Sequence, residues 1–255
     1  IPDPTTPTGR YNALIVKPFI ALTGSVIATG LDALMTARKL EVTNTFCPAP
    51  TSKGLPMEAA ANMAVLFSTQ ANTNPHLDVS AKYYPDMPIA SSWNLSDMKT
   101  YDQRDSLVKK GVTTVDFVQN RFQVQDFVTS YHPDGEVVPQ YRYCRNIMLD
   151  LNVFFGYHLL EEINVIDHAI ASDLDVVSAV NVIKPKQWKS IIRAYAEDLA
   201  KRALIADVQF FQNSITVGLS STNPDRLETF FKYKRSGVAR ISSTTAEAGF
   251  NFGEI

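Results

Sequence analysis

The sequence has little cysteine and no long apolar run. Only Cys47 and Cys144 occur among 255 residues, and they form neither a CxxC pair nor a cluster of metal-binding cysteines. Their wide separation excludes a small disulfide scaffold and indicates two reduced thiols in a reducing compartment. No apolar stretch reaches the roughly 18 residues that span a bilayer, because polar and glycine residues interrupt the nearest candidate, 21–35. We therefore expect no membrane anchor.

The sequence also has no large excess of positive or negative charge. Lys and Arg total 24 against 26 Asp and Glu, a formal net charge of -2. This balance does not favour a nucleic-acid partner or a charged membrane surface. Hydrophobic residues make up 45% and charged residues 20% of the chain, the composition of a globular protein of one or two domains.

The familiar motifs of catalysis and cofactor binding are absent from the sequence. It contains no phosphate-binding GxxxxGK[ST], no GxGxxG, no HExxH and no calcium loop. Ser220 in GLSST is the nearest approach to a GxSxG nucleophile elbow and fails at the last position. His158 and Glu162, four residues apart on one helix face, could share a metal with Asp167 and His168, but we interpret His158 as a hydrogen-bonded core histidine. We predict no enzyme activity, no cofactor and no metal site.

The N-terminal half has the pattern of a mixed α/β fold. Residues 1–10, with three prolines and three threonines, indicate an extended arm or linker. A strand over 11–20, a helix over 31–40 and a strand over 41–46 form a predicted βαβ unit. Further along we expect a mostly buried helix after Pro56, a strand over 76–84, a loop over 85–106, and a hairpin of strands 112–117 and 121–131 with an Asn turn.

The C-terminal half is dominated by helical periodicity. Apolar spacing predicts helices over 141–163 and 187–211, and a strand over 214–221 precedes a strand region over 227–242. On the second helix we expect ion pairs of Glu197 with Lys201 and of Asp198 with Arg202. The predicted division of the chain is an arm remnant (1–10), an α/β domain (11–140), a C-terminal domain (141–241) and a C-terminal arm (242–255).

The two ends of the chain are unlike its body. A Pro/Thr-rich segment precedes it, and the tail ends on alternating Phe250 and Phe252. A strand without a partner in its own chain can add to the exposed sheet edge of a neighbour. Head-to-tail pairing of this kind does not stop at a dimer, so it builds rings or helices of subunits.

Three C-terminal segments carry a resemblance to a known family. They are RNIMLDLNVFFGYHLLEEINVIDH, VNVIKPKQWKSIIRAYAEDLAKRALIAD and VGLSSTNPDRLETFFKYKRSGVARISSTTAEAGF. In content and order they resemble the sheath protein of contractile phage tails. Two earlier segments, CPAPTSKGLPMEAAANMAVLF and NPHLDVSAKYYPDMP, are similar to its preceding domain, so the resemblance covers roughly 45–255.

The resemblance implies a structural subunit rather than an enzyme. Sheath subunits form six-membered rings, stacked helically around a tail tube, and contract to drive the tube through the host envelope. The implied fold is a compact α/β body with a subtilisin-like part, a C-terminal helix–hairpin domain and an extended arm. The implied partners are further copies of the chain, the tail tube protein, and the baseplate and tail terminator proteins. The implied location is the virion, after assembly in the host cytoplasm.

The same resemblance assigns roles to particular residues. The hairpin over 214–241 would belong to the sheet that receives arms from neighbours, and small residues after Ile241 would supply a flexible linker. The arm that exchanges with neighbouring subunits would include Ser242, Thr244, Ala246, Ala248, Phe250 and Phe252. Possible tube-facing cations are Lys189, Arg193, Lys201 and Arg202.

The chain departs from this family in length. Family members are usually longer, with a complete N-terminal arm and a further outer domain, so the chain is interpreted as a stable fragment. Two other functions stay open on the sequence. A hydrolase with an α/β body would react with a serine-directed probe, and a monomeric binding module would keep its partner after both tails are trimmed.

Overall fold

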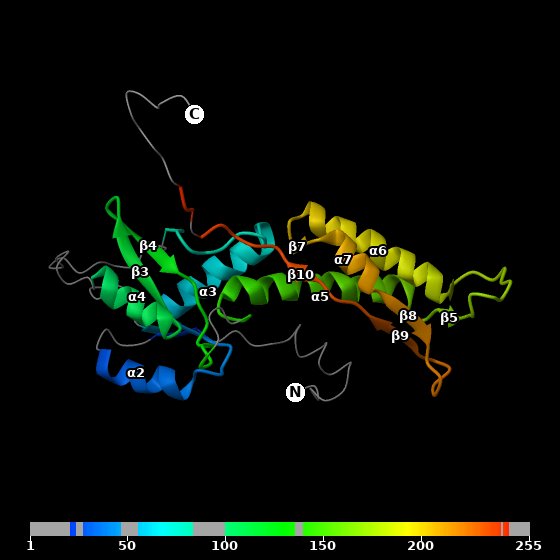
Figure 1. Cartoon of the computed structure of the whole chain (residues 1–255), viewed down its shortest axis with the longest axis horizontal. Coiled ribbons are helices and arrows are strands. Elements are labelled where there is room, and N and C mark those ends of the chain that lie inside the picture. Colours follow the sequence, from blue (N-terminus) through cyan, green and yellow to red (C-terminus); the bar gives the residue numbers. More distant parts are fainter. Residues whose placement is uncertain are drawn as a thin grey trace, which may run out of the picture.

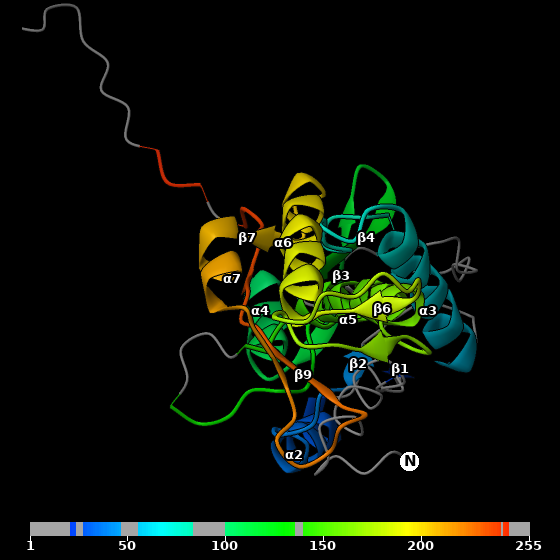
Figure 2. The same ribbon diagram turned by 90° about the vertical axis from the view of Figure 1, so that its right-hand side faces the viewer.

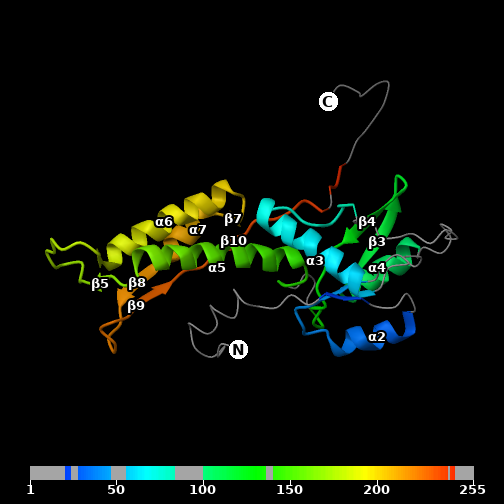
Figure 3. The same cartoon turned by 180° about the vertical axis from the view of Figure 1, so that it is seen from behind.

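A long central helix organises the molecule. The computed structural model describes residues 21–23, 28–46, 56–83, 100–135, 140–240 and 242–244. Helix α5 (Cys144–Asn164) begins beside one group of elements and runs lengthwise along a second group (Figures 1 and 3). One group contains α2, α3, α4, β3 and β4, and the other contains α6, α7, β8 and β9. The structure therefore confirms the mixed α/β class, and the predicted division at residues 140 and 141 stays a prediction.

The first group is built on a four-stranded sheet with the order β1-β2-β3-β4. Strands β1 (Ala21–Thr23) and β2 (Asn44–Phe46) are parallel and joined through α2 (Ala28–Ala37), so the structure contains a βαβ unit, but its first strand, at 21–23, was not predicted. Its predicted strand over 11–20 lies outside the described residues. Strand β2 also pairs in parallel with β3 (Val112–Val118).

The predicted hairpin is confirmed, but its second strand ends at Asp126 rather than at residue 131. Strands β3 and β4 (Arg121–Asp126) are antiparallel, and Phe117 pairs with Phe122. The connecting residues Gln119 and Asn120 both have positive φ, 50° and 63°. Two successive residues in this region define the primed turn whose twist matches that of the flanking strands.

Three predictions for residues 56–109 were wrong in part. Helix α3 (Pro56–Thr73) begins at Pro56 as expected, but over 61–73 it buries one face only, through Met63, Phe67 and Gln70. Residues 76–83 form turns rather than a strand, with one isolated bridge from Tyr83 to Gln123.

Helix α4 (Tyr101–Lys109) occupies part of the predicted loop. Thr100 accepts a hydrogen bond from the Gln103 backbone, and the Gln103 side chain accepts one from the Thr100 backbone. This reciprocal capping box starts the helix. Asp105 and Lys109 add an ion pair of 2.6 Å one turn apart.

Two hydrophobic clusters meet on α5. The N-terminal core contains Cys144 and Met148 from the start of this helix, packed with Phe46, Met63, Phe67, Val79, Val115, Phe122, Val124 and Phe127. The C-terminal core contains Leu149, Val153 and Tyr157 from its middle. A helix of 21 residues is about 30 Å long, so one rigid element joins the two cores. Burial raises the pKa of the Cys144 thiol, which favours its protonated form.

The second predicted long helix is interrupted. Helix α6 spans Pro185–Lys201, and a new helix, α7 (Val208–Ser214), follows after the short strand β7 (Ile205–Ala206). Ala203 and Asp207 have positive φ, 54° and 56°, which is incompatible with a continuous helix. Asp207 then caps α7 by accepting a hydrogen bond from the Phe210 backbone.

Short strand pairs complete the C-terminal half. Strands β5 (Ala169–Ile170) and β6 (Val182–Ile183) are parallel. Strands β8 (Thr216–Leu219) and β9 (Leu227–Phe230) form an antiparallel hairpin, and the sequence TNPDR (222–226) lies in its connection. Strand β10 (Lys234–Arg235) pairs with β7. Among the described residues, no helix combines the length and apolar character needed to cross a membrane.

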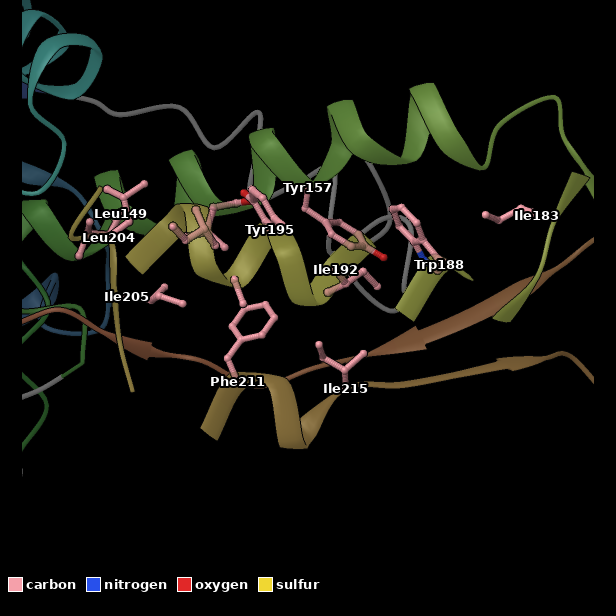
Figure 4. Packing of buried hydrophobic residues seen from close by; sticks show 13 residues of the cluster. Leu149, Tyr157, Ile183, Trp188, Ile192, Tyr195, Leu204, Ile205, Phe211 and Ile215 are labelled. Atoms are coloured by element: carbon pink, nitrogen blue, oxygen red, sulfur yellow. The ribbon is translucent and has the colours of Figure 1, made fainter. Parts of the chain in front are cut away.

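Close packing of α5 against α6 fixes the C-terminal core (Figure 4). Trp188, Ile192, Tyr195 and Leu199 form the buried stripe that the periodicity predicts. The Tyr195 hydroxyl donates a 2.6 Å hydrogen bond to the Val153 carbonyl. A Cβ on Gly156 would lie 2.5 Å from that hydroxyl, so glycine is what allows this approach.

Candidate assembly surfaces

The segment 233–240 returns from the C-terminal core toward the N-terminal core. It follows the β8–β9 hairpin, passes alongside α5, and leads to the C-terminal end of the chain (Figure 1). Strand β10 lies at its start, and the Ser236 backbone donates a hydrogen bond of 3.2 Å to the Leu204 carbonyl. We call residues 233–240 the return segment, because they determine where the predicted arm leaves the body.

A buried carboxylate on α5 holds the first part of the return segment. Asp150 has a side chain only 4% exposed, and it accepts a 2.6 Å hydrogen bond from the Tyr233 hydroxyl. The Arg235 guanidinium donates to both Asp150 oxygens, at 2.8 and 2.6 Å. Burial, reinforced by the charge of Asp150, raises the pKa of the Tyr233 hydroxyl. Both oxygens of the carboxylate therefore accept hydrogen bonds, as a buried polar group requires.

Arg145, the second residue of α5, holds the middle of the segment. Its Nη1 and Nη2 donate to the Ser236 carbonyl and hydroxyl at 2.7 and 2.9 Å. Its Nε donates to the His76 carbonyl at 2.8 Å, and His76 belongs to the turns after α3. One side chain thus links the helix, the N-terminal core and the return segment.

Arg240 ends the segment with a contact to the N-terminal core. Its guanidinium forms ion pairs with Asp78 and Asp126 and lies 3.6 Å from the centre of the Tyr143 ring. Of the predicted arm residues, Ser242 and Thr244 follow two and four residues after Arg240, in a stretch, 242–244, without helix or strand. Ala246, Ala248, Phe250 and Phe252 lie outside the described residues.

The predicted tube-facing cations lie on or next to α6. Arg193 and Lys201 are exposed, Lys189 is partly buried, and Arg202 is the C-terminal cap residue of the helix. Arg202 pairs with Asp198 at 3.6 Å, as expected. Within the described part of the chain the other expected pair is absent, and Glu197 instead accepts a hydrogen bond from Gln212. The exposed face of α6 therefore carries cations and carboxylates together.

An apolar loop projects from the end of the molecule opposite the sheet. It connects β5 to β6, and Figure 2 looks directly at the end that carries it. Leu174, Val176 and Val180 are 85–103% exposed. Two aspartates of the loop accept hydrogen bonds from nearby backbone N–H groups. Asp173 accepts one from Lys186, and Asp175 accepts one from Ser172. Aliphatic side chains presented this way are typical of an interaction surface.

The residues considered for chemistry are not brought together. Ser220 lies within hydrogen-bond distance, 3.3 Å, of Thr222. His158 is half-buried and pairs with Glu162 at 3.0 Å, so it is satisfied as predicted but is not a core residue. In the ranges that the structure describes, no three His, Cys, Asp or Glu side chains gather in a metal-binding group.

Comparison by sequence finds no relatives. No protein-family model matches the chain. No curated protein matches it either.

Comparison by fold finds a chain of a baseplate, a chain of a sheath complex and a sheath tail protein. A chain of the anti-feeding prophage baseplate, solved by cryo-electron microscopy with six-fold symmetry, aligns with 98% of this chain at a TM-score of 0.61 and 14% identity. A chain of the contracted sheath complex of an extracellular contractile injection system, PVC, aligns with 91% at a TM-score of 0.62 and 10% identity. The sheath tail protein of Listeria innocua aligns with 92% at a TM-score of 0.51 and 13% identity.

These matches confirm the sequence resemblance at the level of the fold. The two sheath matches cover 91% and 92% of this chain, which therefore has the fold of these sheath proteins. The alignments cover 67%, 64% and 58% of the three matched chains, so the chain spans about two thirds or less of their length.

Proposed function

We propose that the chain is the structural subunit of a contractile tail sheath, which assembles around a tail tube and contracts to drive the tube through a host envelope. The observation that carries the proposal is the fold, which is shared over 91% of the chain with a contracted sheath complex. The proposed partners are further copies of the chain in helically stacked six-membered rings, the tube protein, and the baseplate and terminator proteins. The proposed location is the virion, and the subtilisin-like character of the α/β part is also a proposal.

Several surfaces of the described residues support self-assembly. The small sheets β5–β6, β7–β10 and β8–β9 have two strands each, so each has edges at which a further strand can pair. The exposed aliphatic loop between β5 and β6 is suited to burial by a neighbouring subunit. An arm that pairs through its backbone with the β8–β9 hairpin of a neighbour would complete such a sheet.

The proposed arm, 242–255, gives contraction a simple physical basis. Backbone hydrogen bonds between an arm and a neighbouring sheet hold two subunits together independently of side-chain contacts between their bodies. Small residues at the base of the arm, beginning with Ser242, Ser243 and Thr244, allow the bodies to rotate. Weak contacts between bodies can then change together while the connected network persists.

The arm proposal predicts the effect of a truncation. A chain that ends after Ile241 is expected to remain monomeric under conditions in which the intact chain forms sheath-like polymers, measured by sedimentation and electron microscopy. Its melting temperature is expected to equal that of the intact chain, because residues 233–240 and their contacts remain. Unchanged polymer formation by the truncated chain would show that the arm does not link subunits.

The proposed tube-facing cations predict a second, separable defect. Reversing two exposed charges, Arg193→Glu with Lys201→Glu, is expected to weaken co-assembly with the tube protein several-fold, because complementary charge governs encounter and register. Self-association through the arm should persist. The matched control reverses Arg226, an exposed cation in the β8–β9 turn, and should leave tube binding intact. If the unmodified chain, the double variant and the Arg226 variant bound the tube protein equally well, the α6 face would not belong to the tube interface.

A further inference from the structure

Two carboxylates from separate elements face one another on the N-terminal core. Asp78 lies in the turns after α3 and is 7% exposed, and Asp126 is the last residue of β4. Ser80 connects them, because its hydroxyl donates a hydrogen bond to Asp126 at 3.1 Å and its backbone N–H donates one to Asp78 at 3.4 Å. Asp78 also accepts a 2.7 Å hydrogen bond from the Val79 backbone. The carboxylates are thus fixed in place by the fold of the N-terminal core itself.

The Arg240 side chain lies between the two carboxylates and also contacts the Tyr143 ring. One terminal nitrogen of the guanidinium donates to Asp78, and the other donates to Asp126. The Tyr143 ring lies 3.6 Å from the guanidinium carbon and covers its flat face, a favourable cation–π arrangement. An arginine is suited to this place because its planar fork can serve two carboxylates and stack on a ring at the same time.

The first part of the return segment is held by contacts that do not involve Arg240. Arg235 and Ser236 are already bound by Asp150 and Arg145. Over 237–240, by contrast, no backbone hydrogen bond is formed to any residue that the structure describes. Among the described residues, the hydrogen bonds that join 237–240 to the N-terminal core are therefore those of the Arg240 side chain.

We propose that Asp78, Asp126 and Tyr143 form an arginine socket, and that Arg240 in this socket anchors the base of the C-terminal arm on the N-terminal core. The proposal rests on the proposed function only in treating 242–255 as an arm. Its consequence is that a pull on the arm acts on the four-stranded sheet, rather than on the β8–β9 hairpin that precedes it in the chain. The pivot of the arm then lies after Arg240, not after Ser236.

Trypsin provides a direct measure of socket occupancy. The Arg240 side chain is 25% exposed, whereas the residue as a whole, backbone included, is exposed. Trypsin must take the arginine side chain into its own acidic pocket before it cleaves the following bond. It therefore competes with the socket for the same group. Where release from the socket is fast compared with cleavage, the cleavage rate follows the population of the released state.

The experiment compares two cleavage sites within one intact chain. Mass spectrometry follows loss of residues 241–255, by cleavage after Arg240, against cleavage after the exposed Arg226. The double variant Asp78→Asn and Asp126→Asn keeps one acceptor oxygen at each position and removes both charges. It is expected to raise the ratio of Arg240 to Arg226 cleavage at least about ten-fold, the scale of lost charge-assisted hydrogen bonds. The matched control, Asp198→Asn, removes a carboxylate paired with the exposed Arg202 and should leave the ratio unchanged.

Two results would overturn the socket. One is cleavage after Arg240 as fast as after Arg226 in the unmodified chain, and the other is an unchanged ratio in the double variant. If the double variant unfolds, cleavage inside α6 rises as well. In that case the comparison uses Tyr143→Leu, which leaves both carboxylates in place. It should raise the ratio several-fold, and an unchanged ratio would again reject the socket. The assay needs no polymer, so its failure is distinguishable from a failure to assemble.

Discussion

Replacing Asp150 by alanine is expected to lower the free energy of unfolding by about 3 kcal/mol, the lower end of the range for breaking a buried ion pair. The substitution leaves the Arg235 guanidinium and the Tyr233 hydroxyl without their acceptor. Arg235 is 22% exposed and can recover part of its hydration, which limits the loss. Urea denaturation followed by circular dichroism measures the change.

The control for this substitution is Asp198→Ala on α6. Asp198 is also paired with an arginine, Arg202, but both side chains are about half exposed and 3.6 Å apart. Exposed pairs contribute about 0–1 kcal/mol, so this variant should unfold close to the unmodified chain. If the two alanine variants lost equal stability, the return segment would not depend on Asp150.

Replacing Gly111 by alanine is expected to cost about 2–5 kcal/mol, the sum of backbone strain and overpacking. Gly111 has a φ of 85°, and an added Cβ would lie 2.6 Å from the Thr129 carbonyl oxygen and 2.8 Å from the Ser130 Cα. These are backbone atoms, so no side-chain rotation can relieve the contact. The result is read from the same urea denaturation.

Gly135 separates the two causes. It has nearly the same φ, 83°, but nothing lies within 4 Å of the position of its Cβ. Gly135→Ala should therefore cost only the conformational strain, about 1 kcal/mol. Equal losses at Gly111 and Gly135 would mean that the close approach of 129–130 to α4 and β3 contributes nothing.

Local signals in the sequence predict much of the secondary structure. The Asn turn identifies the β3–β4 hairpin, and apolar periodicity identifies α5 and the start of α6. The capping box of Thr100 and Gln103 could have identified α4, but it lies next to a turn-rich stretch that suggests a loop. The break between α6 and α7 depends on positive φ at Ala203 and Asp207, and neither glycine nor proline marks it in the sequence.

The candidate site is harder to predict from the sequence. Composition predicts an arm at the C-terminal end, but not the place on the body from which it leaves. That place depends on Arg240 meeting Asp78 and Asp126, which precede it by 162 and 114 residues. No periodicity or local motif connects residues so far apart, and only the packing of both cores on α5 brings them together.

The central claim is tested most directly by negative-stain electron microscopy of the whole gene product, first alone and then with its tail tube protein. We predict hollow or striated helical polymers, with the tube enclosed in the mixed sample. Discrete monomers in both samples, beside bare tubes of the tube protein, would contradict the account.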